Sequence, residues 1–290
     1  MNEATANLAF TPGPLAVKGL KKLGEGRQAE LFIFAGGVVK LFRSSANSAS
    51  ARLEATVMRA LQATGIPMPR ILGTVTIEER PGIVMERLAG PDQLSLLGRK
   101  PWTIWTAAGN LARLHAQLHS TVAPEQLPSL KSSVQAEIKQ SRSIPPEFKE
   151  STLAALDRLP DGVAVCHWDF HPGNVIETAD GPKIIDWTSV RRGNALADVA
   201  RTLLIIRGGA LPPGTPFLVR NLTALGRRVL SWRYLRAYRR LRPFDDTELT
   251  AWGFVGAASR LSYDIPEERV RLLERLDREN RAARERGLLA

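Results

Sequence analysis

The sequence predicts an α+β fold in which a small, β-rich N-terminal region with one helix precedes a larger, mainly helical C-terminal region. Short runs of β-branched and aromatic residues, separated by Gly and Pro turns, fill residues 18–88. From residue 89 to residue 290, apolar residues recur mostly at helical spacing. A chain of 290 residues can give each region its own core. We therefore expect lobes at 18–88 and 89–290 after a flexible lead-in at 1–17.

The first expected elements are strands joined by a tight turn. Leu31–Phe34 and Val38–Phe42 are apolar and β-prone, and they flank Ala35-Gly36-Gly37. Glycine allows the backbone conformations that such a hairpin needs. A further strand is expected just before Gly24, so the N-terminal lobe begins as an antiparallel sheet.

A helix and two more strands complete this lobe. Leu53, Val57 and Leu61 repeat every four residues, which predicts a helix over residues 49–64. Two strand-like runs follow, with a turn at Arg80-Pro81-Gly82 between them: Ile71–Ile77 and Ile83–Leu88.

The C-terminal lobe is predicted to be helical around a short β-rich centre. One helix begins at Pro101, another spans residues 146–159, and the last begins at Pro266. Asp245 and Glu248 have the spacing of a capping box at the start of a further helix. The β-prone runs of the centre are Val163–Val165, Val175-Ile176 and Lys183–Ile185.

The chain is strongly basic, with a net charge of +11 and an isoelectric point near 10.4. Such a charge raises nucleic acid or an anionic membrane surface as a partner. The densest basic segment, residues 227–242, places arginines at helical spacing opposite a stripe through Trp232, Leu235 and Tyr238. That pattern is typical of a solvated helix face. We therefore favour a solvated face over nucleic-acid binding and expect no membrane partner.

The single cysteine and the apolar runs bear on the cellular compartment. One cysteine excludes an internal disulfide and a multi-cysteine metal site, which is typical of a reducing compartment. Cys166 follows three apolar residues, so we interpret it as a small buried residue on a strand. The apolar runs are shorter than a membrane span, and the N-terminus lacks a secretory signal pattern. We expect a cytoplasmic location.

Three polar residues near the β-rich centre carry most of the chemical information: Asp169, Asn174 and Asp186. The first carboxylate can accept a proton from an attacking hydroxyl group. The asparagine and the second carboxylate can hold Mg²⁺ ions against nucleotide phosphates. This pattern predicts a kinase.

Residues of the N-terminal lobe appear in the order that such an enzyme needs. Gly24 and Gly26 lie at the junction of the first strands, where glycine lets backbone N–H groups approach phosphate oxygens. Lys40 lies on an apolar strand and needs an anionic partner, and Glu54 on the next helix is placed to pair with it. Taken alone, such residues are more often a plain turn, an ordinary edge lysine and a helix-surface acid. Their order before Asp169 favours the kinase.

The segment CHWDFHPGNVI, followed by KIIDW, is similar to the catalytic core of the aminoglycoside phosphotransferase and choline kinase families. The segments 111–115 and 84–90 also resemble that group, and the likeness covers residues 18–205. The resemblance implies a bilobal protein kinase-like fold with ATP and Mg²⁺ in the cleft. It also implies transfer of the γ-phosphate to a hydroxyl group of a small molecule.

The resemblance implies a role for each matching residue. Asp169 resembles the catalytic base, Asn174 and Asp186 resemble Mg²⁺ ligands, and Asp198 resembles a structural acid. The residues that would bind the nucleotide are Gly24, Gly26, Lys40, Glu54, Met85, Glu86 and Leu88. Among them, Met85 would lie behind the adenine, with the Glu86 carbonyl and the Leu88 N–H facing its edge. Two positions depart from the usual glycine and leucine of the family: Trp168 and Phe170.

The four histidines have structural interpretations. His167 and His171 flank Asp169, and as neutral imidazoles bonded to the backbone they would hold the shape of the loop. His115 and His119 fall on or beside the apolar face of a helix. No second pair of ligands accompanies them, which favours core or helix contacts over metal ligation.

The acceptor is expected to be small. Asp198 and a new helix follow Asp186 within a dozen residues, which leaves no room for the platform that supports a peptide. The arginine-rich second half argues against a cationic aminoglycoside, whose pocket would need carboxylates. Four acids could still converge locally: Asp92, Asp245, Asp246 and Asp264. We favour a neutral, zwitterionic or anionic alcohol, with Trp252, Arg260 and Tyr263 as candidate pocket walls.

An alternative stays open, namely a nucleotide-binding regulatory protein of kinase-like fold without turnover. Its mark would be the loss of Lys40, Asp169, Asn174 or Asp186, and all four are present. The sequence leaves the oligomeric state open.

Overall fold

The computed structural model describes residues 17–26, 29–208 and 214–285. The predicted lead-in at 1–17 therefore lies outside the described residues, except for Val17. The chain divides into two compact units, which are Met1–Pro91 with Ile176–Thr188 (unit 1) and Asp92–Val175 with Ser189–Ala290 (unit 2). The lobe boundaries set from the sequence stay a prediction.

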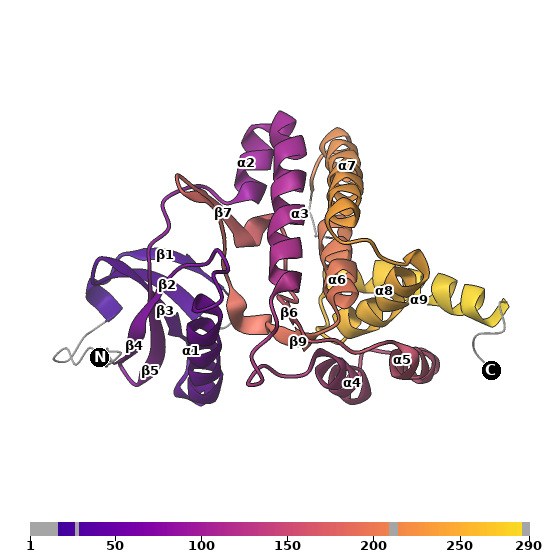
Figure 1. Cartoon of the computed structure of the whole chain (residues 1–290), viewed down its shortest axis with the longest axis horizontal. Helices are drawn as coiled ribbons and strands as arrows, with labels where there is room; N and C mark the ends of the chain where they lie inside the picture. Colours follow the sequence, from indigo (N-terminus) through magenta and orange to yellow (C-terminus); the bar gives the residue numbers. More distant parts are fainter. Residues whose placement is uncertain (1–16, 27–28, 209–213, 286–290) are drawn as a thin grey trace. The chain divides into compact units, whose positions relative to one another are not determined.

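Unit 1 contains a five-stranded antiparallel sheet with the strand order β1-β2-β3-β5-β4 (Figure 1). Its strands are β1 (Lys22–Glu25), β2 (Ala29–Phe34), β3 (Gly37–Phe42), β4 (Ile71–Ile77) and β5 (Arg80–Met85). Helix α1 (Ser48–Gln62) packs against β4 and β5. The shorter elements are the 3₁₀ turns η1 (Val17–Gly19) and η2 (Ser45–Asn47) and the paired strands β7 (Val175–Thr178) and β8 (Gly181–Ile184).

Strand alternation decides which side chains enter the core of this sheet. Successive side chains of a strand point to opposite faces. One face carries the apolar cluster of Phe32, Phe34, Val39, Leu41, Val75, Ile77 and Val84. Lys40 has the opposite parity to Val39 and Leu41, so β3 directs it away from this cluster.

The structure confirms one predicted turn and corrects another. Ala35 and Gly36 connect β2 to β3 with positive φ angles of 47° and 77°, as the hairpin requires. The turn predicted at Arg80-Pro81-Gly82 is wrong, because those residues belong to β5. Glu78 and Glu79, with φ of 48° and 62°, form the turn instead. Two charged residues adopt the left-handed conformation here, which a search for Pro and Gly overlooks.

Unit 2 is mainly helical (Figure 1). Its helices are α2 (Gln93–Arg99), α3 (Ile104–Ser120), α4 (Leu130–Gln140), α5 (Pro146–Arg158), α6 (Ala195–Gly208), α7 (Phe217–Leu241), α8 (Asp246–Leu261) and α9 (Pro266–Glu285). Its other elements are η3 (Pro101–Thr103), η4 (Pro172–Asn174), the paired strands β6 (Ala164–Cys166) and β9 (Arg191–Gly193), and the end of η5 (Trp187–Ser189). α3 packs along α7, α6 packs on α7 and α8, and α8 also contacts α4, α5 and α9.

The basic segment 227–242 lies in α7, and its buried side matches the predicted stripe only in part, because Tyr238 is buried but Trp232 is not. The buried residues are Leu230, Ser231, Tyr234 and Tyr238. Trp232 instead keeps 53% of its surface exposed, with the guanidinium groups of Arg233 and Arg236 over its ring. Spacing alone could not decide between two stripes that each contain aromatic residues. Tyr234 was the better choice because its hydroxyl group has a buried partner.

The capping box predicted at α8 is half right. The Asp245 carboxylate accepts a hydrogen bond from the Thr247 N–H at 2.7 Å. The Glu248 side chain does not accept a hydrogen bond from the backbone N–H of Asp245, as a capping box requires. Its carboxylate accepts instead from Asn194 Nδ2 at 2.9 Å and from Trp252 Nε1 at 3.3 Å. The predictions for this lobe also lacked α2 and α4, which are short and polar.

The sheet and the helical unit confirm the predicted α+β organisation. Cys166 is fully buried on β6, as predicted. None of the helices in the described part of the chain has the length and apolar character that a membrane crossing requires.

Candidate active site

Lys40 lies at the centre of a charged cluster in unit 1. Its ammonium group donates to Glu54 Oε1 at 2.8 Å, to Asp186 Oδ1 at 3.1 Å and to Thr188 Oγ1 at 2.6 Å. Burial alone would lower the pKa of Lys40. The Glu54 and Asp186 carboxylates outweigh that effect, so the pKa lies above its ordinary value. Lys40 therefore stays positively charged.

The two carboxylates of this Lys40 cluster differ in exposure. The Glu54 side chain is 4% exposed, whereas that of Asp186 is 48% exposed. Asp186 also has a φ angle of 61°, in the left-handed region that costs a non-glycine residue about 1 kcal/mol. Glu54 holds Lys40 from the protein side, and Asp186 presents carboxylate surface to solvent.

The chain leaves β5 at Met85, which is buried, and continues through Glu86 to Leu88. The Glu86 N–H donates to the Arg70 carbonyl oxygen at 2.8 Å, and its carboxylate pairs with Lys183 Nζ at 3.0 Å. Within the described residues, neither the Glu86 carbonyl oxygen nor the Leu88 N–H takes part in a hydrogen bond. One backbone acceptor and one donor, two residues apart, can match the edge of a purine base.

The fold itself does not require glycine at position 24 or 26. A Cβ atom on Gly24 would meet nothing within 4 Å, and one on Gly26 would meet only the Ala29 carbonyl oxygen at 3.7 Å. Close approach of a phosphate to this backbone stays a prediction.

In unit 2, Asp169 and Asn174 lie on the loop that follows β6. Asn174 Nδ2 donates to the Asp169 carbonyl oxygen at 2.8 Å and lies 3.4 Å from Asp169 Oδ2. His171 Nδ1 accepts from the Gly173 N–H at 3.0 Å, which confirms that this imidazole is bonded to the backbone. The Asp169 side chain is 34% exposed. The loop therefore fixes the residues around a carboxylate that solvent can reach.

Asp198 anchors this loop from α6. Its Oδ2 atom accepts from the His167 N–H at 2.6 Å, and its Oδ1 atom accepts from the Trp168 N–H at 2.9 Å. The Nε2 atoms of His115 and His119 lie 3.0 and 3.3 Å from the same Oδ2 atom. Asp198 is therefore a structural acid that holds the backbone just before Asp169.

Two tyrosines of α7 complete this Asp198 cluster. His115 Nδ1 lies 2.6 Å from the Tyr234 hydroxyl oxygen, and His119 Nδ1 lies 2.7 Å from that of Tyr238. With Nε2–H donating to Asp198, each Nδ1 accepts from a tyrosine. Burial lowers the pKa of His119 to about 3 and also lowers that of His115. The three side chains could in principle surround a metal ion, but every ligand atom is hydrogen-bonded, which confirms the core role predicted for both histidines.

Trp168, where the family usually has glycine, has a φ angle of 65°. Glycine adopts that conformation without strain, whereas a side chain there costs about 1 kcal/mol. Trp168 is 1% exposed, so burial of its ring offsets the strain. Phe170, the other departure, is fully buried and stacks on His115 with ring centroids 4.3 Å apart.

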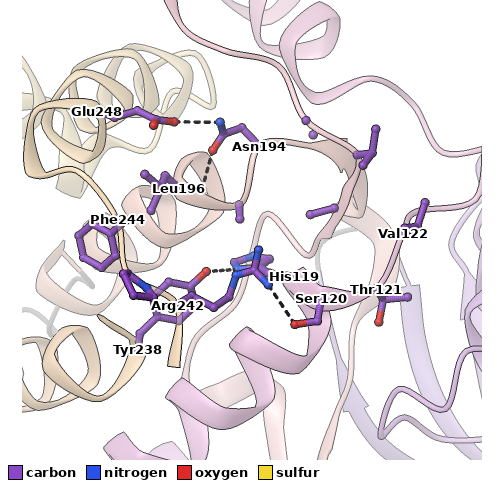
Figure 2. A pocket seen from close by; sticks show the side chains of 16 residues that line it. His119, Ser120, Thr121, Val122, Asn194, Leu196, Tyr238, Arg242, Phe244 and Glu248 are labelled. Atoms are coloured by element: carbon purple, nitrogen blue, oxygen red, sulfur yellow. Dashed lines mark hydrogen bonds between the residues drawn. The ribbon is translucent and has the colours of Figure 1, made fainter. Parts of the chain in front are cut away.

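A cavity of about 360 Å³ in unit 2 lies beside the Asp198 cluster (Figure 2). His119 and Tyr238 line it, but Asp169 does not. Its polar side chains bond to one another, as with Asn194 to Glu248 at 2.9 Å and Arg242 to Ser120 at 3.0 Å (Figure 2). We therefore interpret it as a surface hollow apart from the reaction.

The structure brings together Lys40, Glu54 and Asp186 in unit 1, and Asp169 and Asn174 in unit 2. Sequence reasoning missed Thr188 and the two tyrosine hydroxyl groups. The tyrosines had a usable signal, because Tyr234 and Tyr238 repeat the four-residue spacing of His115 and His119. Thr188 gave none beyond its place two residues after Asp186.

A β-sheet unit with a buried lysine–glutamate pair and a helical unit with an Asp-x-x-x-x-Asn loop define a protein kinase-like fold. The chain belongs to the phosphotransferase enzyme family, whose family model (APH) matches residues 20–244. This match confirms the resemblance inferred from the sequence and makes the chain a phosphotransferase of the small-molecule kinase class.

Solved structures agree on the fold. Amicoumacin kinase in complex with AMP-PNP and Ca²⁺ is 15% identical with a TM-score of 0.60, covering 91% of this chain and 88% of its own. Choline kinase from Cryptosporidium parvum Iowa II is 13% identical with a TM-score of 0.58, covering 93% and 91%. An aminoglycoside-3'-phosphotransferase of type VIII is 19% identical with a TM-score of 0.58, covering 83% and 94%. At these identities the likeness confirms the bilobal kinase-like fold class. No curated protein sequence matches the chain.

Proposed function

We propose that this protein transfers the γ-phosphate of ATP, in the presence of Mg²⁺, to a hydroxyl group of a small molecule. The observation that carries the proposal is the Lys40 cluster. A lysine is kept charged by one buried and one exposed carboxylate, at distances of 2.8 and 3.1 Å. Such a lysine suits a nucleotide phosphate, because its charge is already compensated and its position is fixed.

Each residue of unit 1 has a proposed task toward the nucleotide. Lys40 would bind the α- and β-phosphates, and Glu54 would keep its ammonium group in place. The Glu86 carbonyl and the Leu88 N–H would bind the adenine edge, with Met85 behind the ring. Gly24 and Gly26 would bring backbone N–H groups to the phosphates.

Mg²⁺ would be held by Asn174 and Asp186, and both residues fit that task. Mg²⁺ prefers oxygen ligands. Asp186 offers a half-exposed carboxylate, and Asn174 offers an amide oxygen that carries no hydrogen bond within the described part of the chain. When bound, the ion would offset the negative charge of the phosphates.

Asp169 is the proposed catalytic base. The hydroxyl oxygen of the acceptor forms a bond to the γ-phosphorus, and the bond from that phosphorus to the bridging oxygen of the β-phosphate breaks. ADP leaves with the electron pair, and the Asp169 carboxylate takes the hydroxyl proton. Asp198 acts indirectly, because it holds the backbone before Asp169.

The first test replaces the proposed base. We expect Asp169→Asn to lower turnover by roughly 10²–10⁴-fold, the usual contribution of a general base, and to leave Mg-ATP affinity nearly intact. Turnover is measured as ADP release from Mg-ATP across a panel of alcohols that includes choline, homoserine, sugars and aminoglycosides. Affinity is measured by calorimetry.

The matched control is Asp180→Asn, which changes an exposed aspartate in the turn between β7 and β8. An Asp169→Asn variant that keeps wild-type turnover would refute the assignment. Mg-ATP binding without turnover on any alcohol would favour a regulatory nucleotide-binding protein instead. If the protein does not bind Mg-ATP, the proposed kinase function is refuted. The cytoplasmic location stays a prediction.

A further inference from the structure

Arg201 of α6 is a buried cation without a carboxylate partner. It is 1% exposed, and its only hydrogen bond within the described residues is a long one of 3.5 Å to the Gly256 carbonyl oxygen. Its Nε–H group is buried and finds no acceptor among those residues. Arg260, by contrast, makes two bonds of 2.7 and 2.9 Å to the Glu268 carboxylate. Buried arginines are normally paired, so Arg201 calls for an explanation.

The position of Arg201 beside the catalytic loop suggests why it is unpaired. Its guanidinium group lies 5.2 Å from the centre of the Trp168 ring and 4.9 Å from that of Tyr263. Trp168 directly precedes Asp169, the proposed base. The Trp168 Nε1–H group is likewise buried without an acceptor among the described residues. Two neighbouring side chains, one of them directly before Asp169, therefore each carry a buried N–H donor without an acceptor among the described residues.

A second guanidinium group adjoins the same tyrosine. Arg260 lies 5.8 Å from the Tyr263 ring, and its side chain is 16% exposed. Burial lowers the pKa of Arg201, whereas Tyr263, Asp169 and Glu137 act in the opposite direction. Asp169 also raises the pKa of Arg260. Both arginines thus lie within electrostatic reach of Asp169.

The nearby acids are already engaged. Glu268 pairs with Arg260, and Glu137 accepts from the Ser259 hydroxyl at 2.6 Å and from the Tyr263 hydroxyl at 3.4 Å. The acids that might have formed a cationic pocket are used elsewhere. Asp245 caps α8, Asp246 pairs with Arg239, and Asp264 pairs with Arg269. None of these acids is therefore left to neutralise Arg201.

We propose that Arg201 and Arg260, with the Trp168 N–H and Tyr263, form a subsite for an anionic group of the acceptor. The acceptor is then a small alcohol that carries a carboxylate or a phosphate. This inference rests on the proposed kinase function and names the substrate class of that same site. Aromatic rings stabilise a buried guanidinium only in part. A bound anion supplies the missing charge and accepts from the two unpaired N–H groups.

The test compares matched three-carbon alcohols in the presence of saturating Mg-AMP-PNP, which occupies the nucleotide site. Glycerate and glycerol 3-phosphate are the anionic probes, and glycerol is the neutral probe, with binding measured by calorimetry. We expect at least one anionic probe to bind ten- to a hundredfold more tightly than glycerol, the value of a charge-assisted hydrogen bond. The two anions distinguish a carboxylate from a phosphate.

Two variants and a control locate the effect. Arg201→Met and Arg260→Gln should each weaken binding of the preferred anion about tenfold or more. Arg239→Gln, which breaks the exposed pair with Asp246, should not change it. Arg201→Met should also leave the melting temperature unchanged or raise it, because an unpaired buried charge is removed. If Arg201 were purely structural, Arg201→Met would instead lower the melting temperature.

Several outcomes would overturn the subsite. Equal affinity for glycerol and the anions would do so, as would unchanged anion affinity in both arginine variants or no binding of either anion. ADP release with a cationic or neutral alcohol, unaffected by these variants, would reject the subsite and leave the kinase function standing. Loss of Mg-ATP binding by the wild-type protein would reject the kinase function itself.

Discussion

The Lys40 cluster and the Asp198 cluster both gather hydrogen-bonded titratable residues, but they differ in what they leave exposed. In unit 1, Lys40 keeps its charge between Glu54 and Asp186, and 48% of the Asp186 side chain is exposed. In unit 2, the side chains of Asp198 and the two histidines are fully buried. The Nδ1 atom of each histidine is hydrogen-bonded to a tyrosine hydroxyl group. One cluster retains carboxylate surface for a ligand. The other satisfies its own hydrogen bonds and stabilises a loop.

The difference shows that titratable residues gathered in space are not enough to indicate a reactive site. The ligand atoms of His115, His119 and Asp198 lie within 4.8 Å of one another, as they would in a metal site. Their hydrogen bonds identify them as structural. Accessibility and incomplete pairing are the better signs of function. Arg201 is buried, and it is incomplete pairing alone that singles it out.

The largest expected effect comes from breaking the Lys40 cluster. Lys40→Met leaves the Glu54 carboxylate buried without its cation, which should lower the free energy of unfolding by about 3–5 kcal/mol. Adding Glu54→Gln removes the unpaired charge and should restore most of that stability. Turnover should stay about 10²–10³-fold low in both variants, because the phosphate contact is missing.

Chemical denaturation and ADP release measure these two quantities separately. If the double variant regained turnover together with stability, Lys40 would be a structural residue, and the contrast between the two clusters would fail.

The next largest effect comes from the Asp198 cluster. Asp198→Asn removes the acceptor of two backbone N–H groups and two imidazoles, which should lower the free energy of unfolding by about 3 kcal/mol. Turnover should fall as well, because the backbone before Asp169 loses its anchor, whereas Mg-ATP affinity should not change. Denaturation with urea and nucleotide calorimetry measure both. Asp157→Asn, at an exposed position of α5, is the control, and an Asp198→Asn variant as stable as that control would contradict the structural role.

The two clusters should respond oppositely to pH. Burial lowers the pKa of His119 from 6.5 to about 3, and that of His115 shifts in the same direction. Below pH 6.5 the unfolded chain therefore takes up protons that the folded chain does not. The stability contributed by neutral His119 is fully present above pH 6.5 and should fall as pH drops toward 3, by up to about 1.4 kcal/mol per pH unit. The lowered pKa of His115 adds a loss in the same direction.

The Asp198 carboxyl group, whose pKa lies below its ordinary value, adds to this loss below pH 4. The raised pKa of Lys40 has the opposite consequence, since its contribution is present below pH 10.5 and is lost only as pH rises further. Urea denaturation between pH 7.5 and 4.5 measures the acidic slope. A flat profile would show that the two histidines take up protons equally in the folded and unfolded states, and would contradict their lowered pKa values.

The sequence predicted those parts of the fold whose pattern is local. The alternation of Ile71–Ile77 located β4 at its observed bounds, because one face of that strand is buried. The order of residues shared with kinase-like folds predicted the pair between Lys40 and Glu54, which the structure confirms. It did not predict the contact of Lys40 with Asp186, 146 positions further along the chain. α2 was missed because seven residues leave little periodicity. α4 was missed although Leu130, Val134 and Ile138, its buried residues, repeat every four positions.

The sequence could not predict how buried polar groups pair. Arg201 occurs in a helix of small and apolar residues, and nothing in that run indicates that its guanidinium group lies beside Trp168. Trp168 itself departed from the expected glycine without revealing its φ angle of 65°. Such details depend on packing between helices that are distant in sequence, which residue type and spacing do not encode.

The smallest effect, and the most selective, comes from the outer shell of the Asp198 cluster. Tyr238→Phe removes the hydroxyl group that bonds to His119 Nδ1 at 2.7 Å and should lower the free energy of unfolding by about 1 kcal/mol. Tyr234→Phe should have the same effect through His115, because the two pairs have the same geometry. Neither variant should change kcat/KM, since Asp198 keeps its bonds to the loop. A tenfold loss of kcat/KM in either variant would mean that the tyrosines act on the reaction, and that the Asp198 cluster is more than a structural anchor.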